Sequence, residues 1–445
     1  MIRPKRRAIA SAVSQALTAS SLVASSSSVC AQSSVDDKIA PAAPVGLLEE
    51  VVVTASPGAN RSQLETAASV TSIGADLIED FQPTSESEVL RMIPGIQVAG
   101  TVGPGGNANI AVRGLAVATG GAPFIQIQED GLPTVLFGDI QFGNNDYWTR
   151  FDESVLRVEG VRGGTAATFA SQAPGAIINY ISRTGREEGG QVALTTGIGF
   201  DEQRVGFRYG GPLGDALSYH VGAYFKQGQG PYQIGFNASD SVQIKANLTR
   251  DFSGSSYEGH IRFHVKLADT QEPNYTGSPA LVDLNGRSAD NIRAFPGFDG
   301  RSDSAHSIHN QQFLIVNRSG DLERVNMVGI ATQSLALGNE LRFDFDGGLS
   351  LDNKMRWTDM SGQFTNPFVN AARADSVIGS TVNGATVAEI RYANGPNRGR
   401  LYTGTYLDNN TNVSTNMRDV GSFVNDLTLS MDFDLGNNLL SARAG

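Results

Sequence analysis

The sequence is poor in cysteine, in long apolar runs and in positive charge. Cys30 is the only cysteine among 445 residues, so disulfides, zinc–thiolate sites and cysteine nucleophiles are not expected. Beyond the N-terminus there is no stretch of about 18 uncharged apolar residues, which argues against a membrane-spanning helix in the mature chain. The net charge of −11 argues against nucleic acid as a partner, because phosphate binding needs a basic surface.

Histidine-based chemistry is also sparse. His260 and His264 have the spacing of a metal pair on a helix, but their surroundings predict a strand, on which four residues span about 13 Å. His306 and His309 lie in a long polar segment, where they could touch a ligand. No Ser/His/Asp or Cys/His constellation is recognisable. We therefore expect neither an enzyme nor a metal site or other cofactor.

Residues 1–31 are typical of a targeting segment. A basic start precedes an Ala/Val/Ser/Leu run, and Val29-Cys30-Ala31 offers small residues for cleavage. No acidic residue occurs before Asp36. A secretory signal peptide is the favoured interpretation, and an organellar transit peptide is the alternative.

Residues 32–59 predict a linker that carries a short, isolated strand. The strand-forming Val51–Thr54 follows two glutamates, with Pro41 and Pro44 before it and Pro57-Gly58 after it. This flanking composition indicates a strand on a tether, with no neighbouring strand of its own to pair with.

Residues 60–187 predict a mixed α/β domain. Ser85 to Glu88 form a capping box at the start of a short helix, which Pro94-Gly95 ends. Short strands separated by Gly-rich loops are expected at Ile96–Ala99, Ala108–Val112, Phe124–Gln128, Val155–Val161 and Ile177–Ser182.

From residue 188 onwards apolar and polar residues alternate with a period of two. Strands about ten residues long with one apolar face are typical of a transmembrane β-barrel, whereas strands of a soluble sandwich usually have about five or six residues. The turns at 210–214 and 251–254 are tight, and the segment 270–310 is long, as in outer-membrane barrels. Alternation is clearest at 191–200, 204–209, 217–226, 242–248, 261–267, 341–345 and 427–435.

Several motifs resemble those of the TonB-dependent outer-membrane receptor family. "EEVVVTA" at 49–55 is similar to a TonB box. "IAVRGL" at 110–115, "QEDGLPT" at 128–134 and "RVEGVRGGTAATFASQAPGAIINYISRTG" at 157–185 resemble plug-domain signatures. Gly175-Ala176 stands where the family usually has Gly-Gly, and Gly164 where proline is commoner, which weakens assignment to a subfamily. The resemblance implies a mainly β protein, with an α+β plug domain at 60–187 and the N-terminal part of an antiparallel transmembrane β-barrel at 188–445.

The resemblance also implies a partner for the tethered strand. A free strand can be captured by the edge of a partner sheet through backbone hydrogen bonds, and the family's partner is TonB, coupled to an energising complex of the inner membrane. The TonB-binding residues are then Glu50, Val51, Val52, Val53, Thr54 and Ala55.

Two further sets of plug residues are candidates for function. Arg113 and Arg162 match arginines that latch the family's plug to barrel glutamates, and Glu159 is a possible third member. Surface arginines are the alternative for this set. Phe142, Tyr147 and Trp148, with the glycine-rich segments 100–106 and 116–121, are expected in upper loops. There they either contact ligand or pack between plug and barrel.

The sequence therefore predicts an importer in the outer membrane of a Gram-negative bacterium, in contact with outer-membrane lipid. A ferric siderophore is the expected solute, and a carbohydrate or cobalamin is the alternative. A passive porin or an adhesin is the alternative from another class. Barrels with a plug close with about 22 strands, whereas about ten are recognisable here, so we expect the chain to be an N-terminal fragment with an incomplete barrel.

Overall fold

The computed structural model describes residues 68–445 except 84, 101–107, 116–120, 164–169, 276, 283–291, 383, 394–395, 409–410 and 435–438. The expected signal peptide and TonB box lie outside these residues, as does most of both glycine-rich segments. In the part of the chain that is described, no helix is both long and apolar enough to cross a membrane.

The first folded part is a small α+β domain built on a five-stranded sheet, which we call the plug. Its strand order is β1-β8-β9-β4-β5, and β4 and β9 run parallel. Apolar residues of helix α3 and of the strands form its core, with Val89, Leu90 and Ile93 fully buried. Its elements are β1 (Ser69–Gly74), α2 (Ala75–Phe81), α3 (Glu86–Arg91), β2 (Ile96–Gly100), β3 (Ala108–Val112), β4 (Ile125–Glu129), β5 (Leu132–Pro133), β6 (Asp139–Ile140), β7 (Gly143–Asn144), η2 (Asn145–Trp148), β8 (Val155–Arg162) and β9 (Ala176–Ser182).

The five strands predicted for this domain are confirmed to within one residue at each end. Helix α3 begins after Ser85, as the capping box indicates, but the Ser85 side chain makes no capping hydrogen bond. Instead, buried Glu86 accepts from the backbone N–H of Phe151 at 2.7 Å and pairs with Arg150 at 3.3 Å. The start of the helix is thus fixed by a tertiary contact.

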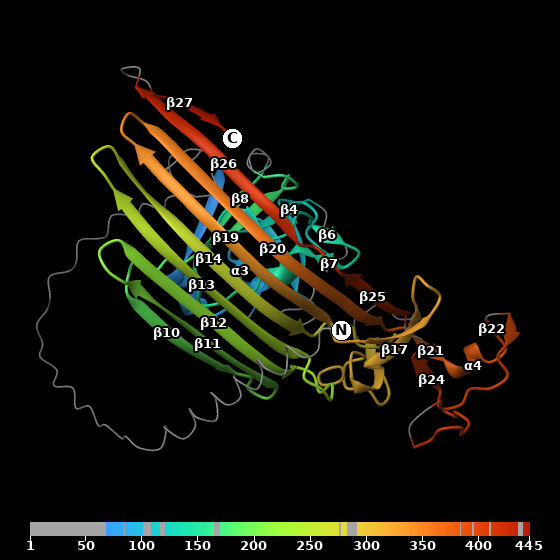
Figure 1. Cartoon of the computed structure of the whole chain (residues 1–445). Coiled ribbons are helices and arrows are strands. Elements are labelled where there is room, and N and C mark those ends of the chain that lie inside the picture. Colours follow the sequence, from blue (N-terminus) through green and yellow to red (C-terminus); the bar gives the residue numbers. More distant parts are fainter. Residues whose placement is uncertain are drawn as a thin grey trace, which may run out of the picture. The chain divides into compact units, whose positions relative to one another are not determined.

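The second part is a ten-stranded antiparallel sheet (Figure 1). Its strands are joined in the order β10-β11-β12-β13-β14-β19-β20-β26-β27, and β25 also pairs with β20. The strands are β10 (Gly189–Thr196), β11 (Asp201–Pro212), β12 (Leu217–Gly230), β13 (Ser239–Ser253), β14 (Tyr257–Glu272), β19 (Ile330–Phe345), β20 (Leu349–Phe368), β25 (Thr411–Met417), β26 (Ser422–Asp434) and β27 (Leu439–Ala444).

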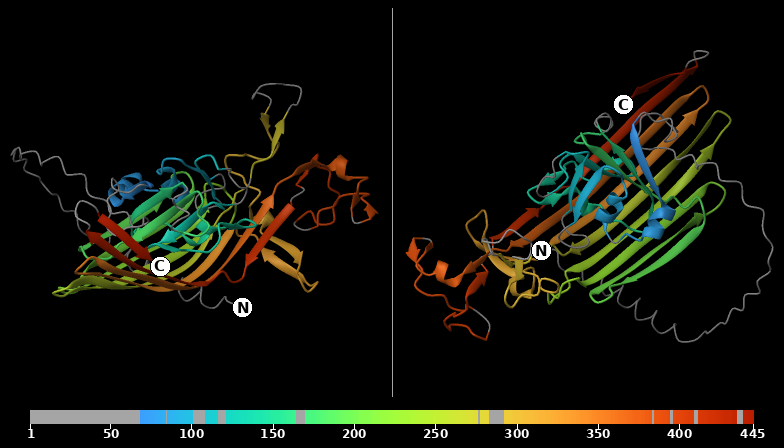
Figure 2. Two further views of the ribbon diagram at one scale, coloured as in Figure 1. Left: turned by 90° about the horizontal axis from the view of Figure 1, so that it is seen from above. Right: turned by 180° about the vertical axis from the view of Figure 1, so that it is seen from behind.

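Alternation gives this sheet two different faces. On β14, Phe263 and Leu267 are 58% and 48% exposed, whereas the residues that precede them, Arg262 and Lys266, are buried. Phe263 lies opposite Leu248 on the next strand, so apolar side chains form a continuous outer face. The polar inner face contacts the plug, which lies against one side of the sheet (Figure 2). Apolar-out and polar-in is the arrangement of a membrane barrel.

Connections differ between the two ends of the sheet. Strands β11–β12, β13–β14 and β19–β20 are joined by short turns at one end, the short-turn end. The other end, the long-loop end, carries the connections 231–238 and 273–329 and the segment from 369 to the start of β25 (Figure 1). These loops contain β15 (Ala280–Val282), β16 (Ile292–Ala294), η5 (Ile308–Asn310), β17 (Gln312–Val316), β18 (Leu322–Asn326), β21 (Ala371–Arg373), α4 (Ala374–Val377), β22 (Thr381–Val382), β23 (Ala385–Thr386) and β24 (Tyr406–Asp408). The predicted asymmetry of connections is therefore present.

Among the described strands, β10 and β27 are the two ends of the pairing order, and no pairing joins them. The sheet is thus open, as expected for an incomplete barrel.

Candidate functional site

The interface between the plug and the sheet is centred on one buried carboxylate, Glu129, at the end of β4. Lys266 lies 2.9 Å from Glu129 Oε1 and Lys245 also 2.9 Å, and the guanidinium of Arg356 lies 3.9 Å from Oε2. Burial by itself raises the pKa of Glu129, but the three cations outweigh burial and hold its pKa well below the usual value. Glu129 is therefore ionised in the folded protein and neutralises part of the sheet's positive charge.

The two lysines of this cluster are direct cross-strand partners, because Lys245 of β13 lies opposite Lys266 of β14. Like charges in that position repel each other and destabilise a sheet unless an anion lies between them. Glu129 supplies that anion, since its Oε1 is the acceptor for both ammonium groups. The plug thus stabilises a pairing that the sheet alone would disfavour.

Other plug carboxylates repeat the same polarity along the interface. Arg262 of β14 lies 3.4 Å from Asp130, and Arg208 of β11 lies 3.0 Å from Glu79. Lys245 also lies 3.7 Å from Asp152, and Arg204 of β11 pairs with Glu153 through its Nη2 at 3.0 Å. In each of these pairs the plug supplies the anion and the sheet supplies the cation.

Backbone carbonyls of the plug accept further hydrogen bonds from the sheet. Lys266 donates to the carbonyl of Trp148 at 2.7 Å, and Gln243 donates to that of Arg150 at 3.0 Å. Arg356 donates to the carbonyl of Leu132 at 3.0 Å and also to that of Pro133. Buried polar groups cost free energy unless they are paired, so these contacts reduce the cost of covering the polar face of the sheet.

The plug approaches the sheet most closely where the sheet carries glycine. A Cβ added to Gly362 of β20 would lie 2.7 Å from the Trp148 ring, and one added to Gly222 of β12 would lie 2.1 Å from Ser154 Oγ. Since real Cβ atoms do not come this close, these positions leave room for plug side chains.

Comparison with known proteins agrees with this geometry. The family model "TonB-dependent Receptor Plug Domain" matches residues 62–177, a range that includes the plug carboxylates paired with the sheet. The ferric enterobactin receptor PirA of Pseudomonas aeruginosa is 30% identical over 194 residues, which is 40% of this chain and 25% of that protein. The vitamin B12 transporter BtuB of Vibrio cholerae is 29% identical over 174 residues, 39% of this chain and 27% of that one.

A solved structure shares the fold of both parts. The closed form of the ferric-catecholate import receptor Fiu from E. coli covers 86% of this chain with a TM-score of 0.56 at 15% identity. The chain carries the plug domain of the TonB-dependent receptors. It spans about a quarter of the length of its curated relatives and 47% of the Fiu chain.

The expected arginine latch between plug and barrel is not found among the described residues. Neither Arg113 nor Arg162 has a described carboxylate within 4.0 Å. Arg113 is exposed and donates to Ser69 Oγ at 2.6 Å, while Arg162 donates to Thr71 Oγ1 at 2.7 Å and to the carbonyl of Pro94. The reason is position, because Arg162 ends β8 beside the edge strand β1 and its side chain stays on the plug.

Glu159, the possible third member, is fully buried and pairs with Arg157 of the same strand at 2.8 Å. The latch through Arg113, Arg162 and Glu159 therefore stays a prediction, and the ion pairs that the described residues form between plug and sheet involve other side chains. The charges are reversed relative to the prediction, with carboxylates on the plug and cations on the sheet.

The aromatic candidates pack between the plug and the sheet, with Tyr147 and Trp148 buried and Phe142 partly buried. Tyr147 and Trp148 are 0% and 2% exposed, and Trp148 Nε1 donates to the carbonyl of Ser361 on β20 at 3.1 Å. Phe142 stacks on Phe364 with 5.3 Å between ring centroids. These contacts are those of packing between plug and barrel, one of the two alternatives left by the sequence, and ligand contact by these residues stays a prediction.

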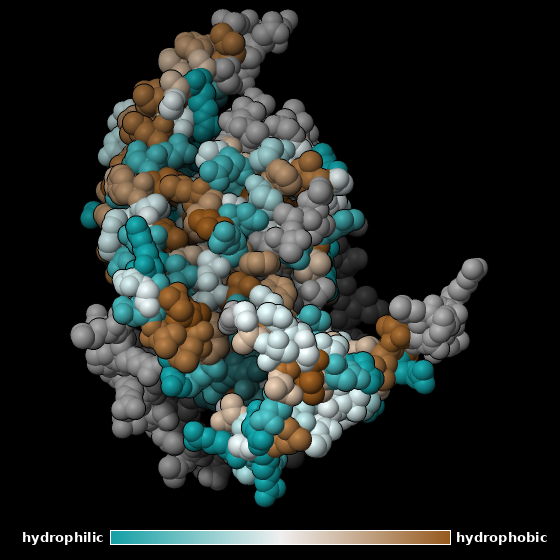
Figure 3. Space-filling view, turned by 90° about the vertical axis from the view of Figure 1, so that its right-hand side faces the viewer, coloured by the Kyte–Doolittle hydropathy of each residue, from teal (hydrophilic) through white to brown (hydrophobic). Residues whose placement is uncertain are grey.

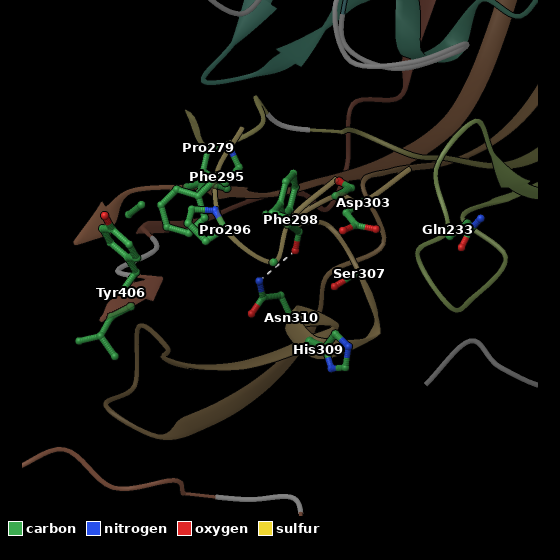
Figure 4. A pocket seen from close by; sticks show the side chains of 16 residues that line it. Gln233, Pro279, Phe295, Pro296, Phe298, Asp303, Ser307, His309, Asn310 and Tyr406 are labelled. Atoms are coloured by element: carbon green, nitrogen blue, oxygen red, sulfur yellow. Dashed lines mark hydrogen bonds between the residues drawn. The ribbon is translucent and has the colours of Figure 1, made fainter. Parts of the chain in front are cut away.

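The long-loop end of the receptor carries a separate cavity of about 470 Å³. Phe295 and Tyr406 lie together at one side of the cavity, with 4.7 Å between their ring centroids, and Gln233 lies at the other side (Figure 4). His309 and Asn310 also line it. Seen from the side of the long loops, the molecular surface mixes hydrophobic and hydrophilic side chains (Figure 3).

The histidines at 260, 264, 306 and 309 lie in four different environments. His309 lines this cavity, but His306 is buried, with its ring nitrogens 3.2 Å and 3.1 Å from the carbonyls of Asn274 and Met327. His260 lies 3.4 Å from Glu340 on the next strand. His264 lies beside the Glu129 cluster. Within the described residues no group of three potential ligands could hold a metal ion.

The sequence reasoning missed the residues that matter most at this interface. Glu129 and Asp130 lie in the quoted "QEDGLPT" motif but were not singled out. A usable signal was present, because Arg262, His264 and Lys266 alternate with apolar residues on a predicted strand. Cations on the inner face of a barrel imply facing anions on the plug.

Proposed function

We propose that the full-length protein is a TonB-energised importer of a ferric siderophore in the bacterial outer membrane. The observation that carries this proposal is the plug seated on the polar face of a sheet whose other face is apolar. Such a plug blocks passive flow, so the solute crosses only when the plug is moved. A porin or adhesin needs no element of this kind.

The partners follow from the same arrangement. Outer-membrane lipid contacts the apolar face, and TonB captures the strand at 50–55, drawing on the inner membrane for energy. The loop cavity beside Phe295 and Tyr406 is where the solute first binds. The protein acts by binding and transport rather than by catalysis.

The solute assignment rests on relatives such as PirA, which is named a ferric enterobactin receptor. Cobalamin is the second candidate, because the vitamin B12 transporter BtuB matches nearly as well.

Uptake assays distinguish these candidates. Cells that lack the gene and cells that carry it on a plasmid are given radiolabelled ferric siderophores or radiolabelled cyanocobalamin. We expect gene-dependent uptake of at least one ferric siderophore, abolished when TonB is absent, with cobalamin uptake unchanged. Gene-dependent uptake of cobalamin alone would favour the second candidate, and gene-dependent uptake without TonB would contradict the energised mechanism.

A further inference from the structure

The cluster of Lys245, Lys266 and Arg356 has the composition of an anion-binding site. One carboxylate, that of Glu129, lies within 4.0 Å of all three cations. All four side chains are almost fully buried, and the cavity between them holds only about 30 Å³. In the closed receptor the anion is therefore supplied by the protein itself.

The site depends on the plug for its negative charge. Glu340 is a carboxylate of the sheet itself. It pairs with Arg262 and, at 3.4 Å, with His260, and not with this cluster. No other sheet carboxylate makes a described ion pair with Lys245, Lys266 or Arg356. When the plug moves, the opposed lysines lose Glu129 and repel each other across the strands.

We propose that this cluster is a binding site on the barrel wall for an anionic group of the transported solute, occupied by Glu129 while the receptor is closed. The solute class is an iron chelate with net negative charge, bound through carboxylate or catecholate oxygens. An arriving anion restores the charge compensation that the departing plug removes, whereas a neutral or cationic chelate does not. Rows of Lys and Arg select anions in pores for the same reason.

This inference rests on the proposed function for the identity of the solute, but the charge preference of the wall can be measured without any solute. The full-length protein is inserted into planar bilayers, and urea is added until the plug is released and conductance appears. The reversal potential is then read in a potassium chloride gradient. We expect the open wild-type channel to prefer chloride.

The test variant carries Glu129→Gln, Lys245→Gln and Lys266→Gln together, so that the two opposed lysines and the carboxylate between them lose their charges at once, while Arg356 keeps its hydrogen bonds to the carbonyls of Leu132 and Pro133. We expect its chloride preference to fall about tenfold, the effect of about 1.4 kcal/mol. The matched control is Lys226→Gln with Glu272→Gln, because these residues form an ion pair of 3.0 Å within the sheet. The control should keep the wild-type reversal potential.

The same variants are compared in cells with two probes, a trianionic ferric tris-catecholate and a neutral ferric tris-hydroxamate. The triple variant should bind the anionic probe at the surface as wild type does but transport it about tenfold more slowly. A cation-selective wild-type channel, or a triple variant with an unchanged reversal potential, overturns the inference. Chloride selectivity without gene-dependent iron uptake would instead overturn the proposed function and leave the anion site standing.

Discussion

At the scale of single residues, Glu129 is the group on which the closed state depends most. Replacing Glu129 with Gln keeps the shape of the side chain but leaves Lys245, Lys266 and Arg356 buried without their common anion. Breaking a buried ion pair by removing one partner typically costs about 3–5 kcal/mol. We therefore expect Glu129→Gln to lower the urea concentration at which the plug is released.

Trp148 reports this release, because it is buried against β20 in the closed state. Its fluorescence is followed in a Trp357→Phe background, which removes the second tryptophan from the outer face. Glu323→Gln, at an exposed position on β18, is the control. An equal urea midpoint for Glu129→Gln and Glu323→Gln would show that the cluster does not hold the plug.

Asp146 gives the plug a dependence on pH. Burial raises its pKa to about 7 from an ordinary 3.8, Arg150 lowers it in part, and Glu86 raises it further. Between these values the folded plug keeps a proton that the unfolded chain releases. Stability should thus fall as pH rises from about 4 to about 7, by up to about 1.4 kcal/mol per pH unit.

Asp146→Asn removes this dependence of stability on pH, because the amide does not titrate. The variant should gain stability relative to wild type at pH 7.5 and little at pH 4.5, measured by urea denaturation at both values. The exposed Asp321→Asn serves as control. A constant difference between Asp146→Asn and wild type across the pH range would contradict the assignment.

At the scale of elements, the fit of the plug to β20 depends on the absence of a side chain at Gly362. A methyl group there would lie 2.7 Å from the Trp148 ring, which is fixed by its hydrogen bond to Ser361. Overpacking of this kind costs about 1–3 kcal/mol. We expect Gly362→Ala to destabilise plug seating by that amount in the same urea assay.

Gly189→Ala is the matched control, because Gly189 is also a strand glycine and an added Cβ would have no atom within 4 Å. Adding Trp148→Phe to Gly362→Ala should recover part of the loss, since the smaller ring leaves space for the methyl group. Equal effects of Gly362→Ala and Gly189→Ala would place the cost in the strand backbone rather than in the contact with the plug.

At the scale of the whole molecule, the proposed function requires energy to reach the plug through the segment at 50–55, which is the predicted TonB-binding strand. Strand addition uses backbone N–H groups, so proline is the disruptive replacement and most changes to alanine should be tolerated. Alternate residues point their N–H groups at the partner, so Val52→Pro and Val53→Pro are tested separately. At least one should abolish uptake while surface binding and protein abundance stay normal.

Transport at the wild-type rate by both proline variants would show that this segment does not bind TonB. Loss of surface binding in either variant would instead indicate a structural role. The two outcomes are separated by measuring binding at low temperature, where uptake does not proceed.

The sequence by itself determined the local structure and the order of the parts. Period-two alternation predicted β11 to β14, because a strand places successive side chains on opposite faces whatever its neighbours are. The alternation is less clear in β20. Its polar Ser350, Asp352 and Lys354 alternate with Leu349, Leu351 and Asn353, so one face is not uniformly apolar. The plug strands and helix α3 were likewise readable from their apolar spacing and turn residues.

Only the tertiary structure decided which charges meet. Lys245 and Lys266 are 21 positions apart by number, and their opposition depends on the register between β13 and β14, which the sequence pattern leaves open. Glu129 reaches both from another domain, more than 100 residues earlier in the chain. Arg113 and Arg162 resemble the latch arginines of the family, yet their described hydrogen bonds are to Ser69 and Thr71 of the plug. Residue types alone do not fix an ion pair, because the pair depends on packing in three dimensions.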